Sequence, residues 1–302
     1  MAMIEARGLG KSYGAKRAVD GLDFVVRPGS VTGFLGPNGA GKSTTMRLML
    51  GLDNGEGRTL FDGKMFHELK HPMRHIGALL EAKPFHPTRR ASDHLRMLAA
   101  ANGVNKARVD EVIGLVGLES VARGRPRKFS MGMGQRLGIA AALLGDPHTL
   151  LLDEPANGLD PEGINWLRRL LQHLAGEGRS VFVSSHLLQE MAVLADELVV
   201  IGRGRLVANG PVADFLSASG LGTVEVTSPD MERLVPVLQE RGATITGTGE
   251  TVTIGGLDAA AVGDVAHELG IRLHQLATRQ ATLEEAFLSA TSQDEEFRGH
   301  DE

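Results

Sequence analysis

The sequence contains no cysteine and few aromatic residues, and each shortage excludes a class of chemistry. Without cysteine in its 302 residues, the chain has no disulfide, no thiol nucleophile and no thiolate ligand for zinc. Aromatic residues make up 4%, which argues against a surface that stacks nucleic-acid bases. The net charge of -5 also disfavours nucleic acid as a partner of the whole molecule.

Long apolar runs are missing as well. No stretch approaches the roughly 20 apolar residues that cross a bilayer. The first residues, MAMIEARGLGKSYG, lack the apolar centre of a signal peptide. We therefore expect no direct membrane span, so that work at a membrane would need another chain to supply it.

Strand patterns alternate with helical patterns over residues 1–217, which we predict to be one domain. Buried strands that alternate with helices indicate an α/β fold with a parallel sheet. The expected strands are 31–36, 149–155, 180–186, the short strands of 3–32 and the hairpin 197–210, and the expected helices are 43–52, 165–178, 188–196 and the mostly helical segment 90–145.

A second domain is predicted after the small-residue stretch SASGLG at 217–222. The pattern over 222–291 reads βαββαβα, with the last helix at 282–290, and indicates a small α+β domain of the ferredoxin-like kind. The charged end, residues 292–302, is expected to be a disordered tail.

Residues 36–43, GPNGAGKS, fit the phosphate-loop pattern G-x-x-x-x-G-K-[ST] between a predicted strand and a helix. Glycines allow the backbone to wrap closely around phosphate oxygens, and the helix points its N-terminus at the anion. Lys42 is expected to reach the β- and γ-phosphates, and the Ser43 hydroxyl to bind Mg²⁺. The alternative is a glycine-rich turn that fits by chance.

Two carboxylates and a histidine follow other buried strands. Asp153 is a candidate second ligand for Mg²⁺, and Glu154 a candidate general base that polarises water. His186 follows the strand VFVSSH and is a candidate partner of the γ-phosphate or the water. The alternatives are a surface turn for the carboxylates and a purely structural histidine.

FSMGMGQR, at 129–136, presents serine and glycines at the start of an apolar helix but contains no lysine. Taken in order, these motifs over residues 3–216 resemble the nucleotide-binding subunit of an ATP-binding cassette (ABC) transporter. GPNGAGKST matches its Walker A motif, LLLDE its Walker B motif, NGLD at 157–160 its D-loop, SSH its switch histidine, and FSMGMGQR lies in the place of its LSGGQ signature.

The resemblance implies a P-loop NTPase (RecA-like) core with antiparallel β and helical subdomains, the latter at about 82–145. It implies an ATPase that uses ATP and Mg²⁺, with Tyr13 stacked on adenine, catalysis by Glu154, His186 and Lys42, and a D-loop contact from Asp160. The implied ATP-binding residues are Tyr13, Gly36, Pro37, Asn38, Gly39, Ala40, Gly41, Lys42, Ser43 and Thr44, and the implied metal ligands are Ser43 and Asp153.

The resemblance also accounts for the missing lysine. In this family two cassettes form a head-to-tail dimer, and the signature of one closes over the ATP held by the other, whose Lys42 supplies the cation. The implied signature residues acting in trans are Ser130, Met131, Gly132 and Met133. Gln135 and Arg136 match the family, whereas Met131 replaces a glycine and Met133 a glutamine, so hydrolysis is implied and its rate is not.

Glu81 stands where the family usually has the Q-loop glutamine, and we expect it to sense nucleotide. LLEA followed by HP and arginine, together with TLEEAF near the end, resembles the cassettes of bacterial drug and antibiotic exporters. That implies a homodimer of ATPase subunits on the cytoplasmic face of the plasma membrane, paired with separate membrane permease subunits. The rival functions are a soluble non-transport ABC ATPase and a regulatory subunit with weak ATPase activity.

Three motifs compete for other functions. HELKH, at 67–71, spells the zinc-protease pattern, but Pro72 disfavours helical geometry at His71. RGRPRK, at 123–128, is basic but broken by glycine and proline, so we expect a loop that contacts the membrane subunit, together with Arg89 and Arg90. WLRRLLQHL is expected to be an amphipathic packing helix rather than a membrane anchor.

Overall fold

The computed structural model describes residues 3–81, 85–218, 223–279 and 283. The chain divides into two compact units, Met1–Gly210 and Pro211–Glu302. The division falls before the stretch 217–222 in which the sequence places the boundary. The predicted tail at 292–302 lies outside the described residues, as does the last predicted helix apart from Leu283.

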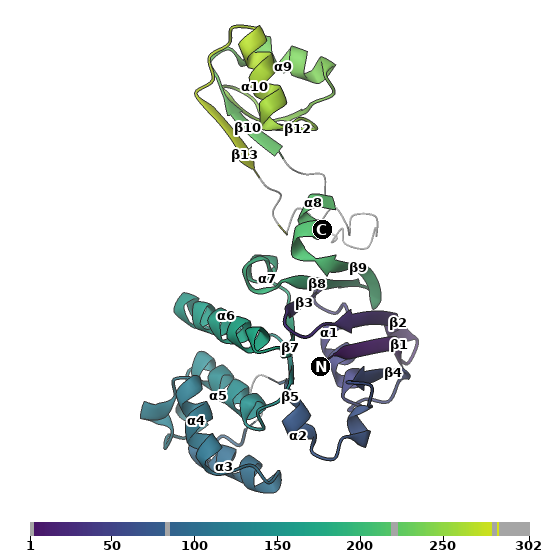
Figure 1. Ribbon diagram of the computed structural model, residues 1–302, viewed down its shortest axis with the longest axis vertical. Helices are drawn as coiled ribbons and strands as arrows, with labels where there is room; N and C mark the ends of the chain where they lie inside the picture. The colour runs from purple at the N-terminus through teal and green to yellow at the C-terminus, as the bar shows by residue number, and fades with distance from the viewer. Residues whose placement is uncertain (1–2, 82–84, 219–222, 280–282, 284–302) are drawn as a thin grey trace. The chain divides into compact units, whose positions relative to one another are not determined.

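A six-stranded sheet forms the centre of the first unit (Figure 1). Its strands β3, β6 and β7 are buried along their whole length, as expected when helices cover both faces. The predicted parallel pairing is confirmed for the five strands from β5 to β8. In sheet order the strands are β5 (Ile76–Leu79), β6 (Thr149–Leu152), β7 (Ser180–Ser185), β3 (Val31–Leu35), β8 (Glu197–Gly202) and β9 (Arg205–Pro211).

A three-stranded antiparallel sheet packs against this core. Its order is β2 (Lys16–Val26), β1 (Ile4–Tyr13) and β4 (Glu56–Phe61). Phe24 of β2 stacks on Phe182 of β7 with ring centroids 5.4 Å apart, and Phe34 of β3 stacks on Phe182 at 4.9 Å. The rings join the two sheets into one hydrophobic core. Helix α1 (Lys42–Met49) begins directly after the phosphate loop.

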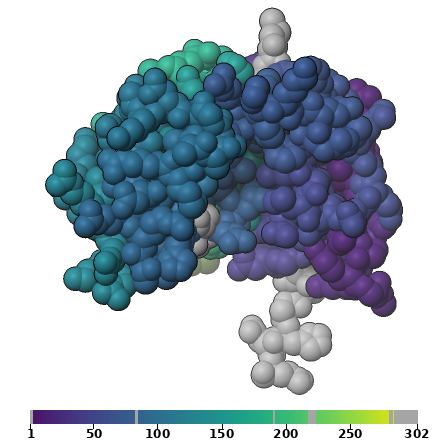
Figure 2. Space-filling view, turned by 90° about the horizontal axis from the view of Figure 1, so that it is seen from below, coloured from purple at the N-terminus to yellow at the C-terminus, as the bar shows by residue number. Residues whose placement is uncertain are grey.

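The segment predicted as mostly helical contains α3 (Ala91–Ala101), α4 (Ala107–Leu115) and α5 (Met131–Leu143). These helices gather away from the antiparallel sheet (Figure 1) and form a separate lobe in the space-filling view (Figure 2). The remaining helices of the unit are α2 (Pro72–His75), α6 (Pro161–Gly176) and α7 (Leu188–Leu194), with 3₁₀ turns at Phe66–Glu68, Glu119–Val121 and Pro126–Lys128.

Helix α6 begins at Pro161, four residues before the start that apolar periodicity predicts at 165. The earlier start has a local cause. The Asp160 side chain accepts a hydrogen bond from the Gly163 N–H at 2.8 Å and so caps the first turn. Pro161 occupies the first helical position, where its fixed φ suits the helix and its missing N–H costs nothing.

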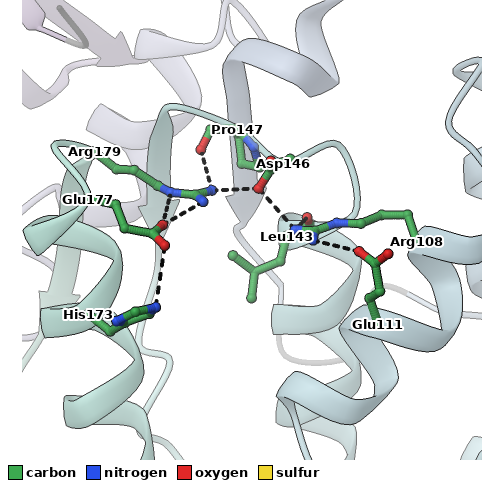
Figure 3. Close-up of polar contacts among 8 residues, drawn as sticks. All are labelled: Arg108, Glu111, Leu143, Asp146, Pro147, His173, Glu177 and Arg179. Carbon is green, nitrogen blue, oxygen red and sulfur yellow. Dashed lines mark hydrogen bonds and ion pairs between the residues drawn. The ribbon is translucent and has the colours of Figure 1, made fainter.

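A polar network ties the helical lobe to the sheet (Figure 3). Asp146, in the connection from α5 to β6, accepts 3.0 Å hydrogen bonds from Arg108 of α4 and from Arg179 just before β7. Arg108 also bonds Glu111, and Arg179 bonds Glu177. Two half-buried guanidinium groups that share one carboxylate fix the spacing of these three segments more firmly than an isolated surface pair would.

The second unit begins with α8 (Val212–Ala218), and its later elements run in the predicted order βαββαβ. They form an antiparallel sheet of order β11-β12-β10-β13 with its own buried core, which includes Val226, Leu234 and Ile254. The elements are β10 (Thr223–Thr227), α9 (Met231–Glu240), β11 (Thr244–Thr246), β12 (Thr251–Gly255), α10 (Ala259–Glu268) and β13 (Gln275–Arg279).

Candidate functional site

The loop between β3 and α1 depends on glycine at defined positions. Gly41 has φ of 107°, and a Cβ there would lie 2.5 Å from the carbonyl oxygen of Ala18. A Cβ on Gly36 would lie 2.6 Å from the carbonyl oxygen of Ile201. The loop therefore packs tightly against β2 and β8, and its backbone takes a form that residues with side chains rarely adopt.

Lys42 lies at the start of α1 and is only 7% exposed. Its Nζ donates to the carbonyl oxygens of Gly36 at 2.7 Å and Pro37 at 3.3 Å. Burial lowers the pKa of Lys42, while the charges of Glu154 and Asp153 act in the opposite direction. The loop thus holds a positive charge in place beside two carboxylates.

An open cleft of about 570 Å³ brings the predicted residues together. The phosphate loop and the start of α1 form one wall, and Glu154, Asn157 and His186 form another. Gly36, Pro37 and Ala40 support the loop without lining the cleft. The lining residues are Tyr13, Lys16, Ala18, Asn38, Gly39, Gly41, Lys42, Ser43, Thr44, Glu154, Asn157 and His186.

Glu154 is the central acid of the cleft. Its Oε2 lies 2.8 Å from His186 Nδ1, and its Oε1 lies 3.8 Å from Lys42 Nζ. Strand β6 ends at Leu152 and β7 at Ser185, so the carboxyl ends of two adjacent parallel strands deliver the pair to the same edge of the sheet. A histidine hydrogen-bonded to a carboxylate at this edge can orient the carboxylate and exchange a proton with it.

Asp153 lies beside Glu154 but does not line the cleft. Ser184, which is fully buried on β7, donates a hydrogen bond to Asp153 Oδ1 and accepts one from the Glu154 N–H at 2.9 Å. The Asp153 N–H donates to the Leu79 carbonyl of β5 at 2.7 Å. Neighbouring strands therefore fix both carboxylates.

Ser130, the first signature residue predicted to act in trans, is the N-cap of α5. Its Oγ accepts a hydrogen bond from the Met133 N–H at 3.2 Å. Met131 is 53% exposed, and its side chain packs on Gly158 of the NGLD loop, where a built Cβ would lie 2.4 Å from Met131 Cγ. A Cβ on Gly132 would meet the Gly158 carbonyl oxygen at 3.0 Å. The signature and the D-loop thus touch within one chain.

Tyr13 and Glu81 lie near Arg47 of α1. The Tyr13 ring is 52% exposed at the cleft, with its hydroxyl 3.3 Å from Asp53 Oδ2. Glu81 follows β5 as an exposed residue, and its charge helps to raise the pKa of Arg47, after the larger effect of Asp53. Glu81 is absent from the lining of the cleft.

The HELKH motif at 67–71 does not form the α-helix that a zinc-protease site requires. His67 lies in the 3₁₀ turn Phe66–Glu68, and His71 has the non-helical angles φ −134° and ψ 71° just before α2. Within the described part of the chain, no group of three or more histidine, aspartate or glutamate side chains is placed to hold a metal ion. No described helix is both long and apolar enough to cross a membrane.

Sequence reasoning missed some of this site. Lys16 and Ala18 line the cleft from β2 and belong to no motif, so only the approach of β2 to the loop reveals them. Asn157 is the first residue of the NGLD match and also lines the cleft. Ser184 is the first serine of SSH, two residues before His186. That position was the sequence signal that could have placed it near the carboxylates.

Comparison with known proteins agrees with this geometry. Residues 19–157 match the ABC transporter domain family, and residues 222–284 match a domain family of unknown function, DUF8746. Over 99% of both chains, the protein is 34% identical to the uncharacterized ABC transporter ATP-binding protein YhcH of Bacillus subtilis (strain 168). The chain belongs to the ABC transporter ATP-binding proteins.

One further relative and one solved structure agree with this assignment. It is 39% identical over 79% of both chains to the bacitracin transport ATP-binding protein BcrA of Bacillus licheniformis. Its fold matches the dimeric post-hydrolysis structure of the ATP-binding cassette MJ0796 bound to ADP and Pi, with a TM-score of 0.63, 22% identity, and coverage of 69% of this chain and 98% of that chain. The protein is therefore an ATP-binding, ATP-hydrolysing subunit of an ABC transporter, with the P-loop NTPase fold predicted from its motifs.

Proposed function

We propose that the cleft binds ATP with its phosphates on residues 36–44 and its adenine against Tyr13. When ATP binds, the Lys42 ammonium group exchanges its hydrogen bonds to the loop carbonyls for contacts with the β- and γ-phosphates. These phosphates would lie against the same wall of the cleft as Lys42. The buried position of Lys42 supports this role. Burial deprives its ammonium group of water, and a negatively charged phosphate bound beside it would offset that loss.

Ser43 and Asp153 fit the needs of Mg²⁺. Both offer oxygen, the ligand type that this ion prefers. Ser43 lines the cleft, and Ser184 hydrogen-bonds only one of the two Asp153 oxygens, which leaves the other for a cation. When bound, the ion would neutralise charge that develops on the transferred phosphoryl group.

The observation that carries the catalytic proposal is the 2.8 Å contact between Glu154 and His186 at the cleft. Glu154 accepts a proton from the attacking water, and His186 orients that carboxylate and the γ-phosphate. Lys42, whose Nζ lies 3.8 Å from the Glu154 carboxylate, stabilises negative charge on phosphate. Gly158 of the NGLD loop lies against the signature, and Asp160 of the same loop is proposed to contact a second subunit.

The position of the signature supports a homodimer with two composite sites. Ser130 and Gly132 open helix α5, whose N-terminus favours an anion, yet the cleft of the same chain is lined by other residues. Met131 and Met133 lie at the same helix start. A second molecule would bring its ATP to this helix, and the ATP-binding cassette MJ0796, which has the same fold, is itself dimeric in its post-hydrolysis structure.

Transport by export through separate membrane permease subunits, at the cytoplasmic face of the plasma membrane, is proposed from the BcrA likeness. A drug, antibiotic or lipid-like molecule is the proposed class of substrate. The basic residues Arg123, Arg125, Arg127, Arg89 and Arg90 are proposed to face the permease. The second unit is proposed to support the dimer; dimerisation that survives deletion of 222–302 would contradict this.

Steady-state ATPase measurements test the catalytic roles. We expect phosphate release that requires Mg²⁺, and a loss of at least about a hundredfold in Glu154→Gln, the usual scale for a general base. Wild-type turnover in that variant would contradict the assignment. Stimulation by the co-expressed permease separates a transport subunit from a regulatory one, which would respond to no membrane partner.

A further inference from the structure

The backbone of Glu154 is held in an uncommon conformation. Its φ is 50°, in the left-handed region, which a residue with a long side chain adopts only when its surroundings enforce it. The residue follows directly after β6, at the edge of the sheet, so the direction of its carboxylate depends on this one backbone geometry. Two side chains from other elements contact that backbone.

Ser184 holds the amide side of Glu154. Its hydroxyl is fully buried, accepts the Glu154 N–H at 2.9 Å and donates its only proton to Asp153. Because one hydroxyl serves both bonds, Ser184 fixes the two neighbouring carboxylate residues relative to β7.

Gln135 holds the carbonyl side. It lies on α5, is 1% exposed, and its Nε2 donates to the Glu154 carbonyl oxygen at 3.1 Å. Its Oε1 is buried and has no hydrogen-bond partner among the residues that the structure describes. A buried amide with an unpaired oxygen destabilises the fold. The hydrogen bond to the Glu154 carbonyl is therefore the favourable polar interaction of the Gln135 side chain.

We propose that Gln135 and Ser184 are positioning residues that clamp the backbone of Glu154, and that Gln135 couples this residue to the signature helix. The inference rests on the proposed role of Glu154 as general base. Gln135 lies in the same helix as Ser130, the residue proposed to meet ATP held by a second subunit. A helix moves as a rigid element, so a shift of its start on nucleotide closure moves the amide that holds the Glu154 carbonyl.

The first test is Gln135→Met in the full chain, a change that keeps side-chain length and removes both amide atoms. We expect kcat for ATP hydrolysis to fall roughly ten- to hundredfold, the scale of a slightly misplaced catalytic group, while KM for ATP changes less than about twofold. The unfolding midpoint should hold or rise, because the unpaired Oε1 is gone. Gln172→Met, the same change at an exposed position of α6, serves as the control and should keep wild-type kinetics.

The second test is Ser184→Ala, which removes the other half of the clamp and gives an independent reading if Gln135→Met folds poorly. It should lower kcat on the same scale. In a Glu154→Gln background, Gln135→Met should not slow hydrolysis further, because Gln135 acts through the Glu154 carboxylate.

Different results would overturn the clamp and the proposed general base. Wild-type kcat in Gln135→Met or in Ser184→Ala overturns the clamp, and so does a rise in KM with kcat unchanged. A further loss on adding Gln135→Met to the Glu154→Gln variant overturns it as well, since Gln135 would then act elsewhere. Wild-type turnover in Glu154→Gln overturns the proposed base instead, and that result is read from a different variant.

Discussion

At the residue scale, Lys42 carries its charge in a site nearly closed to solvent. Burial lowers its pKa, so in the nucleotide-free protein the charged form is held at a cost in stability. We predict that Lys42→Met lowers ATPase activity at least about a hundredfold, as expected when a phosphate contact is removed. The same change should leave the thermal unfolding midpoint unchanged or higher at pH 7.

The pH dependence gives this prediction its sign. A lysine whose folded pKa is lowered penalises the fold while it is protonated, and the penalty disappears as pH rises toward its ordinary value of 10.5. The unfolding midpoints of wild type and variant should therefore converge as pH rises toward about 10.5. A variant that is clearly less stable than wild type at pH 7 would contradict this account.

His94 is a second buried titratable residue, outside the cleft. It lies on α3, is 4% exposed, and neither ring nitrogen has a partner among the described residues. Burial lowers its pKa from the ordinary value of 6.5, and the charge of Arg89 acts in the same direction. The unfolded chain therefore binds the proton more readily, and stability is lost as pH falls below about 6.5.

We predict that His94→Leu raises the free energy of unfolding by about 1 kcal/mol at pH 7.5, since it removes an unpaired buried polar ring. The gain should grow at pH 5.5. Urea unfolding at the two pH values measures both effects, with His75→Leu, at an exposed position, as the control. A gain that is equal at both pH values would show that His94 does not titrate in this range.

At the element scale, the contact of α5 with β5 depends on Gly77. A Cβ there would lie 2.1 Å from the Ala142 carbonyl oxygen of α5. We predict that Gly77→Ala lowers the free energy of unfolding by about 1–3 kcal/mol, because the signature helix must move away from the sheet. Urea unfolding checks this.

Gly176 provides the matched control. It is the last residue of α6, and a Cβ built there meets no atom within 4 Å. Gly176→Ala should be neutral or stabilise by up to about 1 kcal/mol, since alanine favours the helix. Equal destabilisation by the two changes would show that the packing of α5 on β5 is not what Gly77 protects.

The elements themselves were largely predictable. Strands β3, β6 and β7 are short apolar runs bounded by turn residues, and the parallel sheet follows from their alternation with helices. The start of α6 was not predictable from apolar periodicity, because the cap at Asp160 and the proline at 161 decide it. Motif spacing assigned Asp160 to the D-loop and overlooked its second role as a cap.

At the scale of the whole molecule, the motifs predicted that Lys42, Glu154 and His186 meet at the cleft, because each follows a strand or begins a helix at one sheet edge. They could not predict the bond from Gln135 to Glu154, since no sequence rule relates residues 19 positions apart in different elements. The contact of Met131 with Gly158 is equally tertiary. It places the methionine that replaces a family glycine against the D-loop.

We propose above that a second copy of this chain completes the ATP site. Glu154→Gln should bind Mg-ATP without hydrolysing it and so accumulate in the closed state, which light scattering coupled to gel filtration measures as mass. We predict a dimer of Glu154→Gln with Mg-ATP, and monomers when Ser130→Glu is added to place a carboxylate against the partner's phosphate. A monomeric Glu154→Gln protein in saturating Mg-ATP, or an unchanged dimer after Ser130→Glu, would contradict the account.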